Sequence, residues 1–219
     1  MLMSNQTTNE QLTKGDNNMT NQILIEATDA VSIASLAAAA MTGSNAKLTP
    51  QLAEVMIVLK AGELNAAATD RYTAATYKTT AAGPDVEFRL TPAAAKFLIA
   101  NVKRINKHYD VPPVSFTIDP EARLVTITHG GATFSDYWSE LGFPAVGGLV
   151  EAWKPAIEHT SVTLKSEFLA RLNKFLDAFV RVEAWNLELG LNTRSPSNPG
   201  TVMATAGNFS VLIQPRTTR

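Results

Sequence analysis

The chain has 219 residues, 45% of them apolar, which predicts one or two soluble globular domains with enough chain to bury a core. Its 19 basic residues nearly balance its 20 acidic ones, so a nucleic-acid surface has to come from local segregation of charge. It contains no cysteine, which excludes disulfides, a thiol nucleophile and a cysteine-based zinc site and fits a cytoplasmic protein. No signal peptide and no run near the ~20 apolar residues of a membrane helix is visible, so we expect no membrane role.

The first 21 residues are rich in Asn, Thr and Gln and have few large apolar side chains. Such a segment cannot bury enough apolar surface to offset its ordering entropy. We therefore expect a flexible N-terminal tail, within which Met19 is an alternative start.

The next part of the chain has the pattern of a strand and a helix followed by three strands. Residues 23–25 are a short apolar strand, Asp29 is a candidate helix cap, and an alanine-rich apolar helix follows and closes near Gly43. Three predicted strands follow at residues 53–59, 64–69 and 72–79, the first two joined by a hairpin with Gly62 in its turn. The predicted order is β-α-β-β-β.

The same order then repeats. The second copy comprises a strand at 86–90, a helix at 91–107 and strands at 114–118, 124–128 and 133–138. After a connector at 142–158, the third comprises a strand at 161–164, a helix at 165–179 and strands near 182–189, 201–206 and 209–213. We interpret the chain as about three β-α-β-β-β repeats.

The predicted helix in the segment 91–110 separates apolar from basic residues. At the α-helical period, Lys96, Lys103 and Lys107 stack on one side. The other side has Ala94, Phe97, Leu98, Asn101, Val102 and Ile105. Taken alone, this pattern is typical of an ordinary solvated helix face, and a surface for a polyanion is the second interpretation.

Three further segments carry a resemblance to a known family. These are Ala68-Thr69-Asp70 followed by Tyr72, then Gly142-Phe143-Pro144 at the end of the second repeat, and the last strands with Leu212-Ile213-Gln214-Pro215. In these segments the chain resembles a divergent and shortened bacterial DNA polymerase III beta subunit, the DNA sliding clamp. It departs from the family at its end, where Gln214 takes the place of a Met. Asp70 also suits a turn that it stabilises with its own side chain, and both prolines suit a role in setting backbone direction.

The resemblance implies an α+β DNA-clamp fold built from β-α-β-β-β repeats, with helices on the inner face of a ring and sheets outside. On this basis residues 1–21 are a tail, 22–147 a clamp-like domain of two repeats, and 148–219 a linker and a third repeat. Clamps of this family have about six repeats per chain and close as dimers. A ring of similar size then needs about four copies of this chain, in head-to-tail contact.

The resemblance also implies the function and its residues. A clamp encircles duplex DNA without reading its sequence and tethers replication proteins as a processivity factor, so the expected partners are double-stranded DNA, a replicative DNA polymerase and a clamp loader, with no cofactor. The C-terminal segment is the candidate partner site, with Leu212, Ile213 and Pro215. The candidate DNA-binding residues are Lys96, Lys103, Arg104, Lys107, Arg171 and Lys174. The first helix has no Lys or Arg between Asp29 and Met41 and is better explained by packing.

Two other classes of function compete with a clamp. For an enzyme, the three histidines lie far apart without metal-ligand spacing, and neither a phosphate loop nor a nucleophile elbow is present. Glu54, Glu63 and Asp70 are candidate carboxylates for a metal site, but carboxylates at strand ends and in turns are usually solvated. The more serious alternative is a clamp-like interaction module or regulator of a replication complex that does not encircle DNA.

Overall fold

The computed structural model describes residues 21–105, 111–152, 170, 190–192 and 201–213, and only the backbone at 103–105, 190–192 and 202. The predicted strand at 161–164, the predicted helix at 165–179 except for residue 170, and the predicted strand at 182–189 lie outside these residues. The elements, in chain order, are β1 (Asn21–Ile25), α1 (Ala27–Ser35), η1 (Leu36–Ala39), α2 (Ser44–Leu48), η2 (Pro50–Ala53), β2 (Val55–Lys60), β3 (Glu63–Thr69), β4 (Thr73–Thr80), β5 (Val86–Leu90), α3 (Pro92–Ile105), β6 (Val114–Asp119), β7 (Leu124–His129), β8 (Ala132–Tyr137), α4 (Val146–Glu151), β9 (Gly190–Asn192), β10 (Thr201–Ala206) and β11 (Phe209–Ile213).

The strands form two antiparallel sheets. The first strand of each of the first two repeats pairs with the sheet of the other repeat. One sheet has the order β1-β6-β7-β8, so the first strand of the first repeat pairs with the second repeat. The other has the order β5-β2-β3-β4-β11-β10-β9, so the first strand of the second repeat pairs with the first. The predicted β-α-β-β-β order of the first two repeats is confirmed, and their strands are interlocked.

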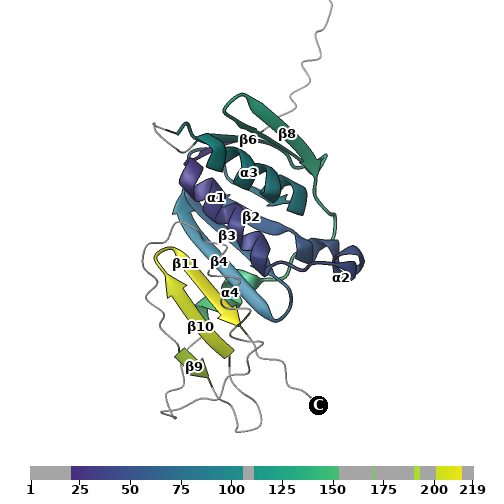
Figure 1. Cartoon of the computed structure of the whole chain (residues 1–219), viewed down its shortest axis with the longest axis vertical. Coiled ribbons are helices and arrows are strands. Elements are labelled where there is room, and N and C mark those ends of the chain that lie inside the picture. The colour runs from purple at the N-terminus through teal and green to yellow at the C-terminus, as the bar shows by residue number, and fades with distance from the viewer. Residues whose placement is uncertain (1–20, 106–110, 153–169, 171–189, 193–200, 214–219) are drawn as a thin grey trace, which may run out of the picture.

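The last strands of the chain extend the sheet of the first repeat. β11 pairs antiparallel with β4, with Phe209 opposite Tyr77 and Ile213 opposite Thr73. Figure 1 shows β11, β10 and β9 continuing that sheet below β4. Backbone hydrogen bonds, in addition to side-chain packing, therefore join the last three strands, β9, β10 and β11, to the first repeat.

The main core lies between α1, α3 and the two sheets, and its side chains follow the expected periods. α1 and α3 contact each other and lie side by side across the strands (Figure 1). Alternate residues of β2 and β6 are buried, as a sheet with one covered face requires. On α3, Ala94, Leu98 and Val102 are fully buried, which confirms the predicted apolar side of that helix.

A close approach at Gly83 joins the two sheets. Leu24 of β1 and Ala82 exchange two backbone hydrogen bonds, of 3.0 and 3.4 Å. Gly83 follows with φ +149°, and a Cβ there would lie 2.5 Å from the Ile23 side chain. Only glycine fits both the backbone angle and the space.

Two local predictions need correction. Asp29 does not cap the first helix, because α1 begins after Glu26 and Asp29 lies in its first turn. Its carboxylate instead accepts hydrogen bonds from Tyr77 and Thr79 of β4. The predicted connector contains a helix, α4, whose residues span the predicted boundary between 147 and 148; the division into domains itself stays a prediction.

Candidate nucleic-acid interface and partner pocket

The helix α3 is fixed at its start by a side-chain cap. Thr91 accepts a hydrogen bond from the Ala94 amide at 3.1 Å, which satisfies one of the unpaired amides of the first turn. The Thr91 hydroxyl in turn donates to Asp136 of β8. Phe97 stacks on Phe134, with ring centroids 5.2 Å apart. These contacts bind the helix to the sheet of the second repeat and fix which side it turns outward.

Lys96 is exposed on the outward side of α3, as the sequence pattern predicts. Lys103 and Arg104 lie on the same helix, where the structure describes the backbone alone. Lys107, Arg171 and Lys174 lie outside the described residues. The structure thus places three of the six candidate DNA-binding residues on one helix and leaves their role as a prediction.

The neighbouring helix α1 contributes packing and no cation, in agreement with the sequence. Its Asp29 accepts a hydrogen bond from the Tyr77 hydroxyl at 2.7 Å and a second from Thr79. Burial and the hydrogen bond to Asp29 raise the pKa of Tyr77 to about 12. The carboxylate therefore anchors α1 to β4.

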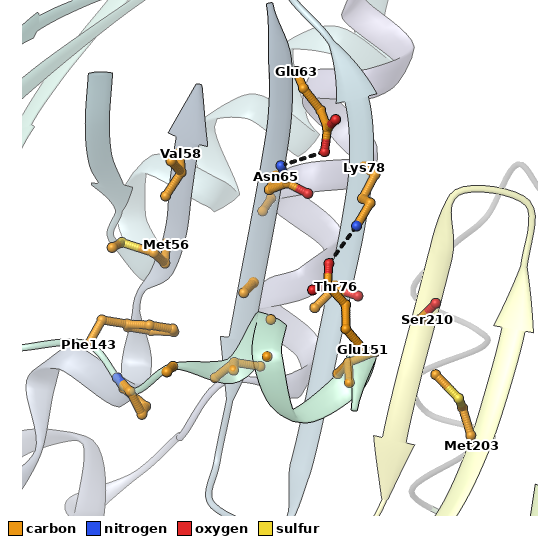
Figure 2. Close-up of a pocket in the computed structure, with 18 residues that line it drawn as sticks. Met56, Val58, Glu63, Asn65, Thr76, Lys78, Phe143, Glu151, Met203 and Ser210 are labelled. Carbon is orange, nitrogen blue, oxygen red and sulfur yellow. Dashed lines mark hydrogen bonds and ion pairs between the residues drawn. The ribbon is translucent and has the colours of Figure 1, made fainter. Parts of the chain in front are cut away.

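The opposite face of the larger sheet has a pocket covered by α4. Along β4, Ala75 and Tyr77 point into the main core, whereas Thr76 and Lys78 line the pocket, as strand alternation requires. The pocket has a volume of about 610 Å³ and lies between α4, the linker around Phe143 and β2, β3, β4, β10 and β11. Figure 2 shows Phe143 near Met56 on one side and Met203 with Ser210 on the other.

The pocket is apolar along α4 and charged at one end. A small second core, beside the main one, consists of Ala74, Val146 and Val150, with Ala67, Phe143, Met203 and Leu212 partly buried against it. At the charged end, Lys78 pairs with Glu151 of α4 at 2.7 Å (Figure 2). The hydrogen bond between them raises the pKa of Lys78 and lowers that of Glu151. This exposed pair attaches the end of α4 to the sheet.

A buried ion pair fixes the linker that forms one wall of the pocket. Arg89 of β5 donates to Glu54 at 3.3 Å and to the Leu141 carbonyl at 2.6 Å. Glu54 accepts from the Ser139 amide at 2.7 Å, and the Arg89 guanidinium lies 5.9 Å from the centre of the Phe143 ring. The network therefore determines where Phe143 stands.

The three candidate partner residues fall in different environments. Leu212 is partly buried in the small core beside α4. Ile213 points to the other face and is 1% exposed in the main core. Pro215 lies outside the described residues. The sequence patterns did not predict the rest of the pocket wall. The apolar spacing of Val146 and Val150 was the signal for α4, but Gly147 and Gly148 concealed it.

The carboxylates considered for a metal site are not brought together. Glu54 is paired with Arg89, Glu63 accepts from Asn65, and Asp70 accepts from the amides of Tyr72 and Thr73 in its turn. The predicted turn role of Asp70 is confirmed. Within the described residues no group of three metal-ligating side chains occurs. His129 is 2% exposed, and neither ring nitrogen has a hydrogen-bond partner in the described part.

The interlocked repeats, with their helices on one face, are the fold of a bacterial DNA sliding clamp. The structure of the beta clamp of Helicobacter pylori, bound to a DNA ligase peptide, aligns with a TM-score of 0.60 over 90% of this chain, at 13% identity. The beta subunits of Pseudomonas aeruginosa and Thermotoga maritima each align with a TM-score of 0.54, at 11% identity, over 90% and 89% of the chain. The predicted resemblance to the DNA polymerase III beta subunit is confirmed for the fold.

The chain spans 64 to 65% of the length of these clamps. No protein-family model and no curated protein sequence matches it. Among the helices that the structure describes, none has both the length and the hydropathy to cross a bilayer.

Proposed function

We propose that the protein is a DNA sliding clamp, a non-catalytic accessory protein that encircles duplex DNA without sequence specificity and tethers a DNA polymerase. The observation that carries this proposal is the clamp fold with α1 and α3 together on one face and Lys96 exposed on α3. A protein that slides must attract phosphates without reading bases, and mobile lysines do this through weak, salt-dependent contacts. From the helical period of the sequence, we expect Lys103 and Lys107, with Arg104 beside them, to extend the same basic face.

The proposed ring contains several copies of this chain, since one copy spans about two thirds of a clamp subunit. Inside such a ring the helices face the DNA and the sheets lie outside. The remaining candidates, Arg171 and Lys174, would contribute from the third repeat. A clamp loader and a cytoplasmic location belong to the same proposal.

The test is topological. Subunits are dissociated, assembled again in the presence of a nicked circular plasmid, and separated from free protein at about 0.5 M salt, where unlinked contacts are weak. A clamp stays on the circle and leaves when the plasmid is cut once. Protein that elutes identically from circular and linear DNA contradicts encirclement.

Charge reversal identifies the surface. The triple variant K96E/K103E/K107E should lose retention on the circle while its oligomer mass is unchanged. Its residual affinity for short duplex DNA should depend less steeply on salt, by about 0.9 in log–log slope for each phosphate that the protein no longer neutralises. The matched control, K47E/K60E/R123E, has the same net charge and changes exposed cations away from α3. Equal loss of retention in both variants would show that total charge, and not this helix, determines retention.

The second candidate function, a clamp-like interaction module, is favoured by the pocket beside α4. The Helicobacter pylori clamp binds a DNA ligase peptide, and a partner peptide with apolar side chains would suit the pocket here, which Val146, Val150 and Met203 line and beside which Leu212 is partly buried. Replacing Leu212 with Glu should weaken capture of a polymerase peptide and leave DNA retention intact. Unchanged DNA retention in the α3 triple variant, with L212E abolishing partner capture, favours the interaction module.

A further inference from the structure

The short helix α4 lies on the larger sheet and forms one side of the pocket. It contacts β3, β4 and β11, and its Val146 and Val150 are buried with Ala74 of β4 in the small second core. Leu149, on the outward side of α4, is exposed. Within the described part of the chain, α4 is therefore held from the sheet side and is open to solvent on the other.

The sequence of α4 gives it little helical tendency of its own. The helix has 6 residues, and two of them are the adjacent Gly147 and Gly148. Helices this short are marginal in water, and glycine lowers their stability further. The helical form therefore depends on the contact of Val146 and Val150 with the sheet, and a segment that leaves the sheet has little to keep it helical.

The chain before α4 is attached to the interior by a buried network. Arg89 donates to the Leu141 carbonyl at 2.6 Å and lies 5.9 Å from the centre of the Phe143 ring. Arg89 is itself paired with the buried Glu54. Breaking these contacts would leave a buried charge without its partner, which is costly. The start of α4 is therefore firmly held.

The end of α4 is attached by an exposed ion pair. Lys78 Nζ lies 2.7 Å from Glu151 Oε1, and the two side chains are 51% and 63% exposed (Figure 2). Exposed pairs contribute little to stability and are weakened by salt, because water solvates both partners once they separate. The two ends of α4 are thus held with very different strength.

We propose that α4 is a hinged lid on the pocket, which opens at its Glu151 end about the fixed Phe143 end, with the Lys78–Glu151 pair as its latch. Opening lifts Val150 from Ala74 and uncovers the small second core. In the closed form, Val150 occupies the surface that an apolar partner peptide contacts. This regulation rests on the proposed peptide binding at the pocket. Higher ionic strength favours the open form, because it screens the latch.

Single thiols measure the opening, because the chain has no cysteine of its own. V150C marks the moving end of the lid, A74C the sheet beneath it, V146C the hinge end, and A204C the main core. Each variant is labelled in its native state with N-ethylmaleimide, a small neutral probe, and its rate is divided by the rate in urea. The ratio follows the population of the form in which the thiol is uncovered. V150C and A74C should be labelled faster than V146C and at least about tenfold faster than A204C, since local opening needs less free energy than global unfolding.

Replacement of Lys78 removes the latch. K78M should speed the labelling of V150C and A74C by about 2- to 5-fold, as expected for the loss of an exposed ion pair. Salt at about 0.5 M should speed the labelling of both thiols when Lys78 is present and have little effect in K78M. The matched control is R123M, which loses the exposed pair with Glu140 away from the lid and should leave both rates unchanged.

A charge exchange separates the pair from its single members. In the A74C protein, E151K should speed labelling, and K78E/E151K should restore the slow rate because the two charges again attract. Equal labelling of V150C, V146C and A204C would overturn the proposal, since all three would then report unfolding of the whole protein. Equal rates in K78M and R123M, no rescue by the exchange, or a faster V150C without a faster A74C would overturn it as well. These experiments contain no peptide, so failure of the lid and failure of the proposed peptide binding, which L212E tests, give different results.

Discussion

At the scale of single residues, the buried pair of Arg89 and Glu54 has the largest expected effect on stability. The two side chains are 9% and 5% exposed, and both are bonded to the segment that follows β8. Removing one member of a buried pair leaves an uncompensated charge. The pair therefore couples the stability of the fold to the position of the linker at the pocket.

The replacement R89M should lower the free energy of unfolding by about 3 to 5 kcal/mol. Urea denaturation followed by circular dichroism measures this change. R123M is the matched control, because Arg123 pairs with Glu140 at 3.5 Å on the surface, where a pair contributes at most about 1 kcal/mol. A loss of stability in R89M no larger than that in R123M would contradict the role given to the buried pair.

The raised pKa of Tyr77 predicts that the protein loses stability at high pH. Its pKa is about 12 in the folded protein, against 10.0 for an ordinary tyrosine. Between these values the unfolded chain loses its proton first, so stability is fully present below pH 10 and falls as the pH rises toward 12. The full difference is about 2 to 3 kcal/mol.

The measurement for Tyr77 compares urea unfolding of the wild type and Y77F at pH 8, 10 and 11.5. The difference between the two proteins removes the titration of the other tyrosines and of the lysines. It should shrink or change sign as the pH rises. A constant difference across the range would show that the Tyr77 hydroxyl does not remain protonated in the fold.

At the scale of elements, α3 depends on the contacts of Thr91 at its start. T91V keeps the shape of the side chain but loses both the cap of Ala94 and the hydrogen bond to Asp136. We expect a loss of about 1 to 3 kcal/mol in the free energy of unfolding by denaturant titration. The control T128V removes an exposed hydroxyl on β7 and should change stability by less than about 0.5 kcal/mol. A similar effect of the two changes would rule out a special role for the cap.

The elements also show which sequence patterns were sufficient. Alternation predicted β5, β6 and β7 to within a residue, because each buries one face against the helices. The 3.6-residue period predicted α3 and the exposure of Lys96, because that helix also buries one side only. α4 was missed because it is only 6 residues long and contains Gly147 and Gly148, which disfavour an isolated helix. Packing on the sheet through Val146 and Val150 outweighs that preference.

At the scale of the whole molecule, the ladder between β4 and β11 predicts that the described strands unfold as one cooperative unit. Val211 and Ile213 of β11 belong to the same core as α1 and β2. V211A should therefore cost about 1 to 3 kcal/mol and leave a single transition, with tryptophan fluorescence and circular dichroism coinciding. S210A, on the other face of β11, should change little. Two separate transitions would mean that the strands β9, β10 and β11 unfold independently of the rest.

The sequence by itself determined the element order of the first two repeats, the clamp resemblance and the basic side of one helix. These follow from local patterns, since burial of one face imposes a period on each strand and helix. Only the tertiary structure decided that β1 and β5 are exchanged between repeats, that β11 covers β4, and that Phe143, Val150 and Leu212 meet in the small second core. The period and composition of a strand are the same whichever strand it pairs with. The pairing therefore depends on how the whole chain buries its core.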